Sequence, residues 1–270
     1  MDNRPIGVFD SGLGGLTAVK ELEQVLPQES LVYFGDTGRV PYGSRSRETV
    51  RRYAKQDMAF LLERGVKAVL AACGTVSSTA RDIGESLGVP YFDVVLPTAR
   101  AAAAATKNKK VGVIGTNATI HSDAYRKALL QLDYKLQVFS QPCPLFVPLV
   151  ENAFVSPQDE VTRLVAQRYL APIREAGVDT LILGCTHYPI ISATIASVMG
   201  RGVTLIDSGR EAATALAQAL REGDLLCDGT VPRQADFFVT DEPENFTGVA
   251  ELFLGHSVNG HTSRINIETY

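Results

Sequence analysis

Short apolar runs rich in β-branched residues alternate with stretches of helical periodicity along most of this 270-residue chain. Repeated strand-then-helix patterns are typical of parallel sheets whose strands are joined by right-handed helical crossovers. The sequence therefore predicts an α/β fold. We expect strands at residues 6–9, 31–35, 68–72 and 89–94, and a second set at residues 111–115, 136–140, 180–184 and 203–206.

The two sets of expected strands are similar in sequence, which indicates an internal repeat. Residues 7–10 align with 112–115, residues 71–75 with 183–187, and residues 91–93 with 205–207. The offset between aligned residues ranges only from 105 to 114, as small loop insertions between two α/β units would give. Chance similarity between βα units is the alternative, but the alignment also pairs Cys73 with Cys185. Each cysteine would lie just after an equivalent strand.

The segment after the second set continues the α/β pattern. Residues 210–222 predict a helix, and residues 234–240 predict a late strand that must join one of the two sheets. With 45% hydrophobic residues, a chain of this length can bury a core without disulfides or a structural metal. No long Gly/Ser linker separates the two units, so we expect them to be closely apposed.

Charge and composition argue against several classes of partner. The formal net charge is −4 without a dense Lys/Arg run, so the sequence has no electrostatic footprint for nucleic acid. Apolar runs fall far short of the ~20 residues that span a bilayer, and the N-terminal residues show no export signal. The four cysteines form no CxxC pair, which favours reduced thiols. We therefore expect a cytoplasmic protein that binds neither nucleic acid nor membranes.

Polar side chains gather where the expected strands end. In open α/β sheets, ligands bind beyond the carboxyl ends of the strands, where loops and helix N-termini converge. Such an edge suits a carboxylate ligand, because hydroxyl groups donate hydrogen bonds and helix N-termini carry a positive partial charge. Capping of the following helix is the alternative role for any single Ser or Thr there. The residues at these ends are Asp10, Ser11, Cys73, Thr75, Thr116, Thr119, Cys185, Thr186 and His187.

Cys73 and Cys185 are the strongest candidates for catalysis. A carbon held between two thiols can lose its proton to a thiolate on one face and gain one from a thiol on the other, which inverts its configuration. A thiol pKa of about 8.5 makes the thiolate accessible near neutral pH. Asp10 would oppose a Cys73 thiolate by charge, so we expect it to accept or relay the thiol proton. His187 is the corresponding group beside Cys185, as a proton acceptor or as a cation that favours the thiolate.

The difficult step in such a reaction is to make a carbanion beside a carboxylate. The sequence has no signature of a pyridoxal phosphate lysine, so we expect no cofactor to act as an electron sink. An enclosed, dry site with hydrogen-bond donors aimed at the substrate carboxylate is the remaining physical route. We expect residues 36–43 and 148–152 to help form this enclosure.

A dinucleotide site is one competing interpretation. Gly12-x-Gly14-Gly15 with Asp36 after the second strand has part of the dinucleotide-binding fingerprint. Thr17, however, takes the place of the third glycine, and the Asp10 carboxylate would lie close to an anionic pyrophosphate. We therefore favour a site without a nicotinamide cofactor.

A zinc site is the other competing interpretation, because Cys73, Cys185 and His187 could supply three ligands. No further residue at ligand spacing supports it, so we expect no metal. Lone buried cysteines are usually inert members of a core. We expect this role for Cys143 and Cys227.

Five motifs together resemble the cofactor-independent glutamate racemases of bacterial cell-wall synthesis: FDSGLGGLTAV, YFGDTGRVPYGSRS, the CxT at Cys73, VGVIGTNAT and LGCTHYP. The resemblance covers nearly the whole chain. It implies two pseudo-symmetric α/β domains with the active site in the cleft between them. The first domain would comprise residues 1–97 and 208–270, and the second residues 98–207. It also implies that a cytoplasmic homodimer supplies D-glutamate for peptidoglycan, with glutamate as the substrate and with no cofactor.

The resemblance also assigns roles to residues. It implies that Cys73 and Cys185 are the two acid/base groups, assisted by Asp10 and His187. One departure is that the family usually shows Asn where this chain has Gly74, which removes an amide donor. The motif LGCTHYP favours glutamate racemases over aspartate racemases. The alternative outside the enzymes is a non-catalytic two-lobed protein that binds acidic small molecules. The residues implied to hold the substrate are Asp10, Ser11, Pro41, Tyr42, Gly43, Gly74, Thr75, Thr116, Thr119, Glu151, Thr186 and His187.

Overall fold

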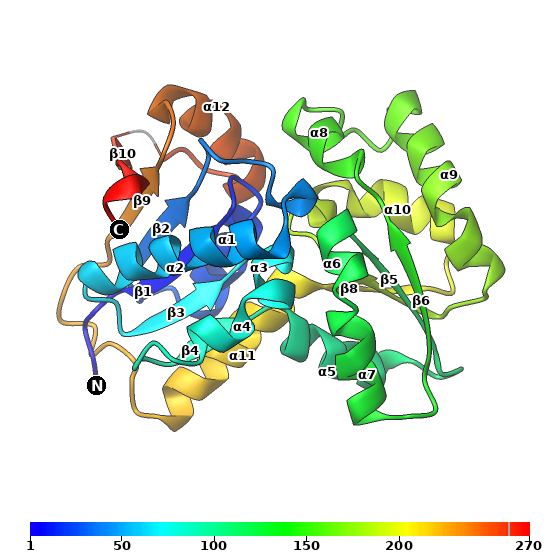
Figure 1. The fold of residues 1–270 in the computed structure, drawn as a ribbon, viewed down its shortest axis with the longest axis horizontal. Helices are drawn as coiled ribbons and strands as arrows, with labels where there is room; N and C mark the ends of the chain where they lie inside the picture. Colours follow the sequence, from blue (N-terminus) through cyan, green and yellow to red (C-terminus); the bar gives the residue numbers. More distant parts are fainter. Residues whose placement is uncertain (259) are drawn as a thin grey trace.

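The computed structural model describes residues 1–258 and 260–270, and within them the strands form two wholly parallel sheets (Figure 1). This arrangement confirms the predicted α/β class with two parallel-sheet domains. The first sheet has the order β10-β9-β2-β1-β3-β4, and the second the order β6-β5-β7-β8. The strands are β1 (Ile6–Asp10), β2 (Leu31–Gly35), β3 (Ala68–Ala71), β4 (Tyr91–Asp93), β5 (Lys110–Gly115), β6 (Gln137–Pro142), β7 (Thr180–Leu183), β8 (Thr204–Asp207), β9 (Ala235–Val239) and β10 (Thr262–Arg264).

Helices connect the strands, and several begin at a side chain that caps them. Ser46 accepts a hydrogen bond from the backbone N–H of Thr49, and Asp159 accepts one from Thr162. Such caps satisfy amide groups that have no partner inside the helix. The helices are α1 (Leu16–Val25), α2 (Arg47–Glu63), α3 (Gly74–Thr79), α4 (Arg81–Gly84), α5 (Val95–Ala105), α6 (Asn117–His121), α7 (Ala124–Leu132), α8 (Phe146–Glu151), α9 (Glu160–Glu175), α10 (Ser192–Met199), α11 (Ser208–Glu222) and α12 (Pro243–Leu254), with 3-10 turns η1 (Tyr42–Ser44), η2 (Tyr188–Ile191) and η3 (Ile267–Thr269).

The internal repeat corresponds to an equivalent strand order in the two sheets. The order β2-β1-β3-β4 in the first sheet matches β6-β5-β7-β8 in the second. Expected strand bounds agree with the observed ones to within two residues at each end. Cys73 follows β3 and Cys185 follows β7, so the two cysteines occupy equivalent places at the carboxyl ends of equivalent strands.

The tail of the chain completes the first sheet. β9 pairs in parallel with β2, with Tyr33 opposite Phe237, and β10 pairs with β9. The expected late strand is therefore confirmed, whereas α12 and β10 are elements that the sequence reasoning did not include. The domain limits at residues 97/98 and 207/208 remain a proposal, which the membership of β9 and β10 in the first sheet supports.

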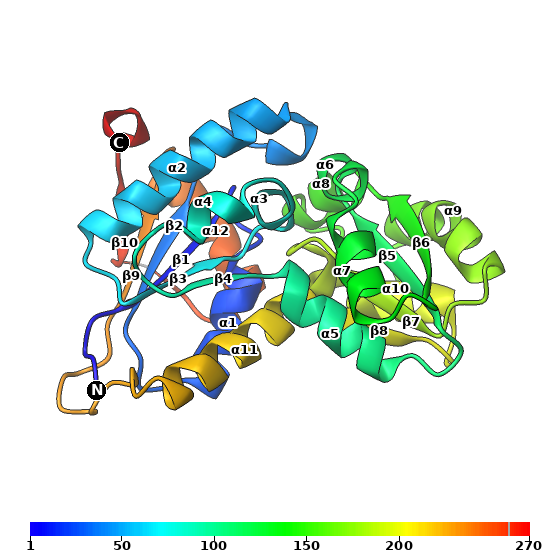
Figure 2. The same ribbon diagram turned by 60° about the horizontal axis from the view of Figure 1, so that its bottom comes forward.

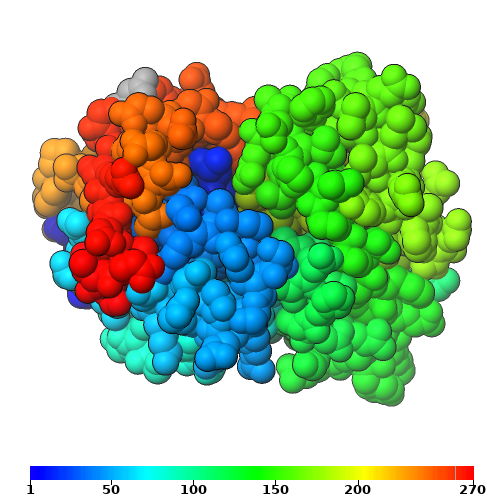
Figure 3. All heavy atoms as spheres, turned by 45° about the horizontal axis from the view of Figure 1, so that its top comes forward, coloured from blue at the N-terminus to red at the C-terminus, as the bar shows by residue number. Residues whose placement is uncertain are grey.

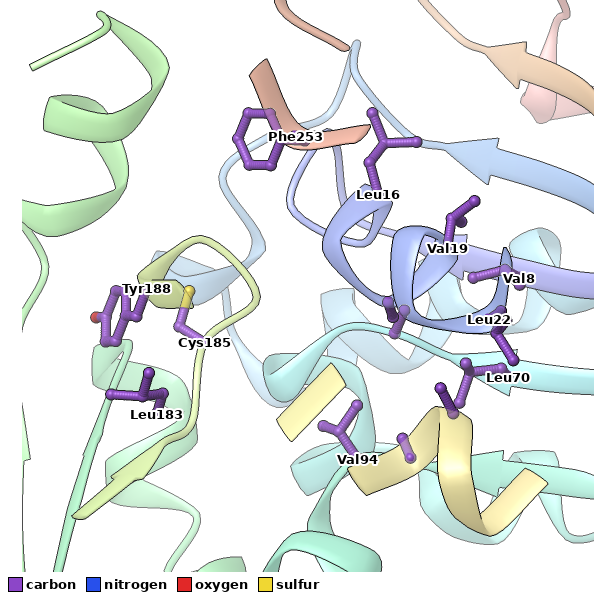
Figure 4. Packing of buried hydrophobic residues seen from close by; sticks show 14 of the residues in the cluster. Val8, Leu16, Val19, Leu22, Leu70, Val94, Leu183, Cys185, Tyr188 and Phe253 are labelled. Atoms are coloured by element: carbon purple, nitrogen blue, oxygen red, sulfur yellow. The ribbon is translucent and has the colours of Figure 1, made fainter. Parts of the chain in front are cut away.

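The two domains are joined by continuous packing as well as by the chain. One cluster of buried side chains runs from α1, with Leu16 and Val19, to the end of β7 and the segment after it, with Leu183, Cys185 and Tyr188 (Figure 4). α5 and α11 lie against each other at the junction (Figure 2). In the space-filling view the two lobes meet along a seam (Figure 3). No helix among the described residues is both long enough and apolar enough to span a bilayer.

Candidate active site

The residues expected at the site line one cavity of about 350 Å³ between the two domains. This volume is in the range of small-molecule sites. The cavity lies at the carboxyl ends of both sheets, where the α/β rule placed it. The expected residues that line it are Asp10, Ser11, Pro41, Tyr42, Gly43, Cys73, Gly74, Thr75, Thr116, Thr119, Glu151, Cys185, Thr186 and His187.

Cys73 lies in the first domain beside a carboxyl group. It is 4% exposed, and its Sγ lies 3.5 Å from the Ser11 hydroxyl oxygen. Asp10 ends the neighbouring strand β1, and its Oδ2 accepts hydrogen bonds from the backbone N–H groups of Gly12 (3.3 Å) and Gly15 (2.9 Å). Burial, followed by the charge of Asp10, raises the pKa of the Cys73 thiol, and burial raises the pKa of Asp10. This side of the cavity therefore favours a neutral thiol.

Cys185 lies in the second domain beside an imidazole. Its Sγ is 3.9 Å from His187 Nδ1, and His187 Nε2 lies 2.9 Å from Glu151 Oε1 on α8. Burial alone would lower the pKa of His187, but its hydrogen bonds to Cys185 and Glu151 outweigh burial and raise that pKa to about 10. His187 is therefore a cation at neutral pH, and its positive charge lies close to the Cys185 sulfur.

Threonine hydroxyl groups form a chain across the seam. Thr75 Oγ1 lies 3.1 Å from Thr116 Oγ1, which lies 3.0 Å from Thr119 Oγ1. Thr116 also caps α6, because its Oγ1 accepts the backbone N–H of Thr119. Thr116 thus both caps α6 and lines the cavity. On the other side of the cavity, the Thr17 hydroxyl donates to the backbone carbonyl of Thr186 (3.0 Å), which ties the two domains together.

Tyr42 is held by a buried charged network behind the cavity. Its hydroxyl donates to Asp36 and lies 3.1 Å from Asp57 Oδ2. Arg39 pairs with both carboxylates, at 2.6 Å to Asp36 and 3.1 Å to Asp57. Thr240 donates to the other oxygen of Asp36 (2.9 Å). The Asp36 carboxylate is therefore fully occupied inside the protein, which removes the acid that a dinucleotide ribose would need.

The enclosing segments contribute fewer residues to the cavity than expected. Residues 40–43 of the segment 36–43 line it, as do Pro148 and Glu151 of the segment 148–152. Asn117 and Ser44 are polar lining residues that the sequence reasoning missed. Asn117 directly follows Thr116 and begins α6 after β5, so the rule that predicted Thr116 could also have predicted Asn117. The remaining lining residues that were missed are Gly12, Pro144, Val147 and Gly184.

The other cysteines differ from each other. Cys143 is fully buried, as expected for a core residue. The same prediction for Cys227 is wrong, because its side chain is only partly buried and its Sγ lies 3.4 Å from the Gln28 carbonyl in a loop. Among residues 1–258 and 260–270, no group of three or more His, Cys, Asp or Glu side chains is arranged to hold a metal ion.

The chain matches known proteins over nearly its whole length. The family model for Asp/Glu/Hydantoin racemase matches residues 13–216. A glutamate racemase of Geobacter metallireducens is 45% identical over 266 residues, covering 98% of this chain and 97% of the relative. The solved glutamate racemase of Francisella tularensis in complex with D-glutamate has a TM-score of 0.93 at 41% identity, with 100% of both chains covered. The glutamate racemase of Thermus thermophilus in complex with β-chloro-D-alanine has a TM-score of 0.89 at 44% identity, again with 100% of both chains covered.

The fold and the cavity between its domains are thus those of an amino-acid racemase. The chain belongs to the Asp/Glu/hydantoin racemase family, and it is an isomerase. The resemblance inferred from the five sequence motifs is confirmed.

Proposed function

We propose that this protein interconverts L-glutamate and D-glutamate by moving protons between the substrate α-carbon and the thiols of Cys73 and Cys185, without a cofactor. One observation carries the proposal: two cysteines from equivalent strands of two domains line the same cavity. Glutamate as the substrate is supported by the similarity to glutamate racemases and by the D-glutamate bound to the Francisella protein.

The charges around the two thiols support a defined starting state. We assign the starting thiolate to Cys185, which lies 3.9 Å from the His187 ring, and the starting thiol to Cys73, whose pKa is raised by burial beside Asp10. The Cys185 thiolate takes the α-proton from one face of the substrate, and the Cys73 thiol gives its proton to the opposite face. The configuration inverts, and the two sulfurs exchange their protonation states.

The remaining cavity residues suit an amino acid with two carboxylates. We assign the hydroxyl groups of Ser11, Thr75, Thr116 and Thr186 to the carboxylates, because hydroxyl donors stabilise the negative charge that grows as the proton leaves. Glu151 carries a negative charge at the cavity wall and is 36% exposed, so we assign it to the substrate ammonium group as well as to His187.

We further propose that the D-glutamate serves peptidoglycan precursor synthesis in the cytoplasm and that the enzyme is a homodimer. The family resemblance supports these proposals. Analytical ultracentrifugation tests the assembly: a species of twice the mass of the 29.1 kDa chain is expected, and a monomer at all concentrations would contradict it.

Hydrogen exchange in D₂O tests the reaction. The protein is incubated with L-glutamate and with D-glutamate without added cofactor, and the α-deuterium content and the optical rotation are followed together. We expect α-deuterium incorporation with loss of optical activity from either enantiomer. No incorporation would favour a non-catalytic binder, and faster turnover of aspartate than of glutamate would assign the enzyme to aspartate.

A further inference from the structure

Three glycines of the first domain meet the second domain at the cavity. A Cβ added at Gly14 would lie 2.2 Å from Thr186 Oγ1, and one added at Gly43 would lie 2.8 Å from Thr116 Cβ. A Cβ added at Gly74 would lie 2.3 Å from the carbonyl oxygen of Gly184. All three distances are shorter than non-bonded atoms tolerate. The two domains therefore approach each other at points where the first domain has no side chain.

The contact at Gly74 differs from the other two because its neighbour is backbone. A side chain at Gly14 would meet the Thr186 hydroxyl, which can rotate. At Gly43 it would meet the Cβ of Thr116, which rotation cannot move, and at Gly74 the Gly184 carbonyl, which is fixed by its own domain. The Gly184 N–H donates to the Ile114 carbonyl (2.8 Å), and a Cβ on Gly184 would itself lie 3.0 Å from the Tyr125 ring. The segment that carries this carbonyl thus has no room to move back into the second domain.

Gly74 and Gly184 are the chain neighbours of the two cysteines. Gly74 directly follows Cys73 at the start of α3, and Gly184 directly precedes Cys185. The Ser77 N–H donates to the Cys73 carbonyl, and the Ser78 hydroxyl to the Gly74 carbonyl, so the first turn of α3 is also well fixed. A change in the distance between Gly74 and Gly184 is therefore passed directly to the two thiol-bearing segments.

We propose that Gly74, assisted by Gly43, is a positioning residue that sets how closely the two cysteine segments approach across the cavity. The inference rests on the proposed two-thiol reaction. A methyl group at residue 74 needs the domains to separate by on the order of 1 Å, and misplacement of that size can reduce a rate by about 10²-fold.

An increased distance between the two thiols can be distinguished kinetically from a general destabilisation of the protein. Removal of the α-proton needs one thiolate within hydrogen-bond reach, but inversion needs both sulfurs in reach of the same carbon. A widened cavity therefore slows inversion more than exchange with solvent. The ratio of α-deuterium incorporation to racemisation measures this difference.

The test compares Gly74→Ala with the parent enzyme in D₂O. We expect kcat for racemisation to fall about 10²-fold with a smaller change in KM, and the exchange-to-racemisation ratio to rise. Gly248→Ala is the matched control, because a Cβ at this helical glycine in α12 meets nothing within 4 Å. It should keep parental kinetics.

The outcomes separate this inference from the proposed function. Parental kcat in Gly74→Ala, or a parallel loss of exchange and racemisation with a lowered Tm, would overturn the positioning role. A parent enzyme that does not racemise glutamate would instead overturn the proposed function. If Gly74→Ala does not fold, Gly43→Ala takes its place: a raised exchange-to-racemisation ratio supports the inference, and an unchanged ratio overturns it.

Discussion

The two cysteine segments occupy equivalent places in the two domains but have opposite electrostatic surroundings. Cys73 follows β3 and lies beside the buried carboxyl of Asp10, whereas Cys185 follows β7 and lies beside the His187 imidazole, which Glu151 supports. The repeat thus places a thiol at equivalent positions in the two domains, but the residues next to the two thiols differ. A buried carboxyl group thus lies beside one thiol and a cationic imidazole beside the other.

This difference has a consequence for the kinetics of the two enantiomers. The equilibrium constant of a racemisation is unity, so kcat/KM must be the same in both directions. A difference between the two thiols can therefore be detected only in the separate values of kcat and KM for each enantiomer, or in the rate of α-hydrogen exchange. Variants of the two thiols and of their neighbours should change these quantities by different amounts.

Replacement of either thiol should have the largest effect. In Cys73→Ser and in Cys185→Ser, we expect racemisation to fall by at least about 10³-fold, because a serine hydroxyl is too weak an acid to replace a thiol in proton transfer. Each variant should still exchange the α-hydrogen of one enantiomer only, and the two variants should differ in which one. Circular dichroism follows inversion, and mass spectrometry follows deuterium.

Cys227→Ser is the matched control for both variants, because Cys227 lies outside the cavity. It should racemise as the parent does. If either Cys73→Ser or Cys185→Ser racemised glutamate at the parental rate, one base would suffice. The two thiols would then not have complementary roles.

Removal of the imidazole tests the cationic half of the cavity. We expect His187→Gln to lower kcat about 10²-fold, since the Cys185 thiolate loses its cation. Glu151→Gln should have a smaller effect, about tenfold, by lowering the pKa of His187 and moving the alkaline limb of the pH–rate profile to lower pH. An alkaline limb that stays in place in Glu151→Gln would show that the 2.9 Å contact does not control the imidazole.

Neutralising Asp10 tests the anionic half. In Asp10→Asn, the charge that opposes the Cys73 thiolate is lost, so we expect alkylation of Cys73 by iodoacetamide near neutral pH to rise about tenfold, while racemisation falls. Mass spectrometry of the Cys73 peptide measures the labelling. A slower alkylation than in the parent would mean that Asp10 activates the thiol instead of holding its proton.

The pH dependence of stability tests the charge of His187 in the absence of substrate. The pKa of His187 is about 10 in the folded protein and about 6.5 in an unfolded chain, so the folded state binds the proton more tightly. The resulting stabilisation is complete below pH ~6.5, declines above it, and is lost as the pH rises through about 10, at up to about 1.4 kcal/mol per pH unit. The Tm of the parent should therefore fall more steeply with pH than that of His187→Gln, and parallel curves would contradict this.

Local rules were sufficient to place the thiols. A cysteine at the end of a buried parallel strand lies at the sheet edge where ligands bind, and the repeat aligned Cys73 with Cys185. The sequence placed Glu151 in an expected enclosing segment, but its contact with His187 could not be predicted, because no local pattern shows that a residue of α8 contacts that ring. The same limit applies to Tyr42, whose hydroxyl binds carboxylates that include Asp57, distant from it in sequence.

Some of the elements that were not predicted have a recognisable sequence pattern, and others have none. α12 begins with Pro243, and Phe246, Ala250 and Phe253 recur at helical spacing on its buried face, so the sequence could have predicted it. β10 spans only three residues, too few for a periodicity. The partial exposure of Cys227 depends on a loop that packs near Gln28, and no neighbouring residue indicates it.

The pairing of β9 with β2 determines which domain can complete its sheet first during synthesis. Strands β5 to β8 leave the ribosome as one uninterrupted run and can assemble while the tail is still being made. β2, although translated far earlier, keeps an open edge until residues 235–239 emerge to pair with it. The half of the protein that is synthesised first is therefore finished last, and a stalled chain would present an unpaired strand on which aggregation can begin.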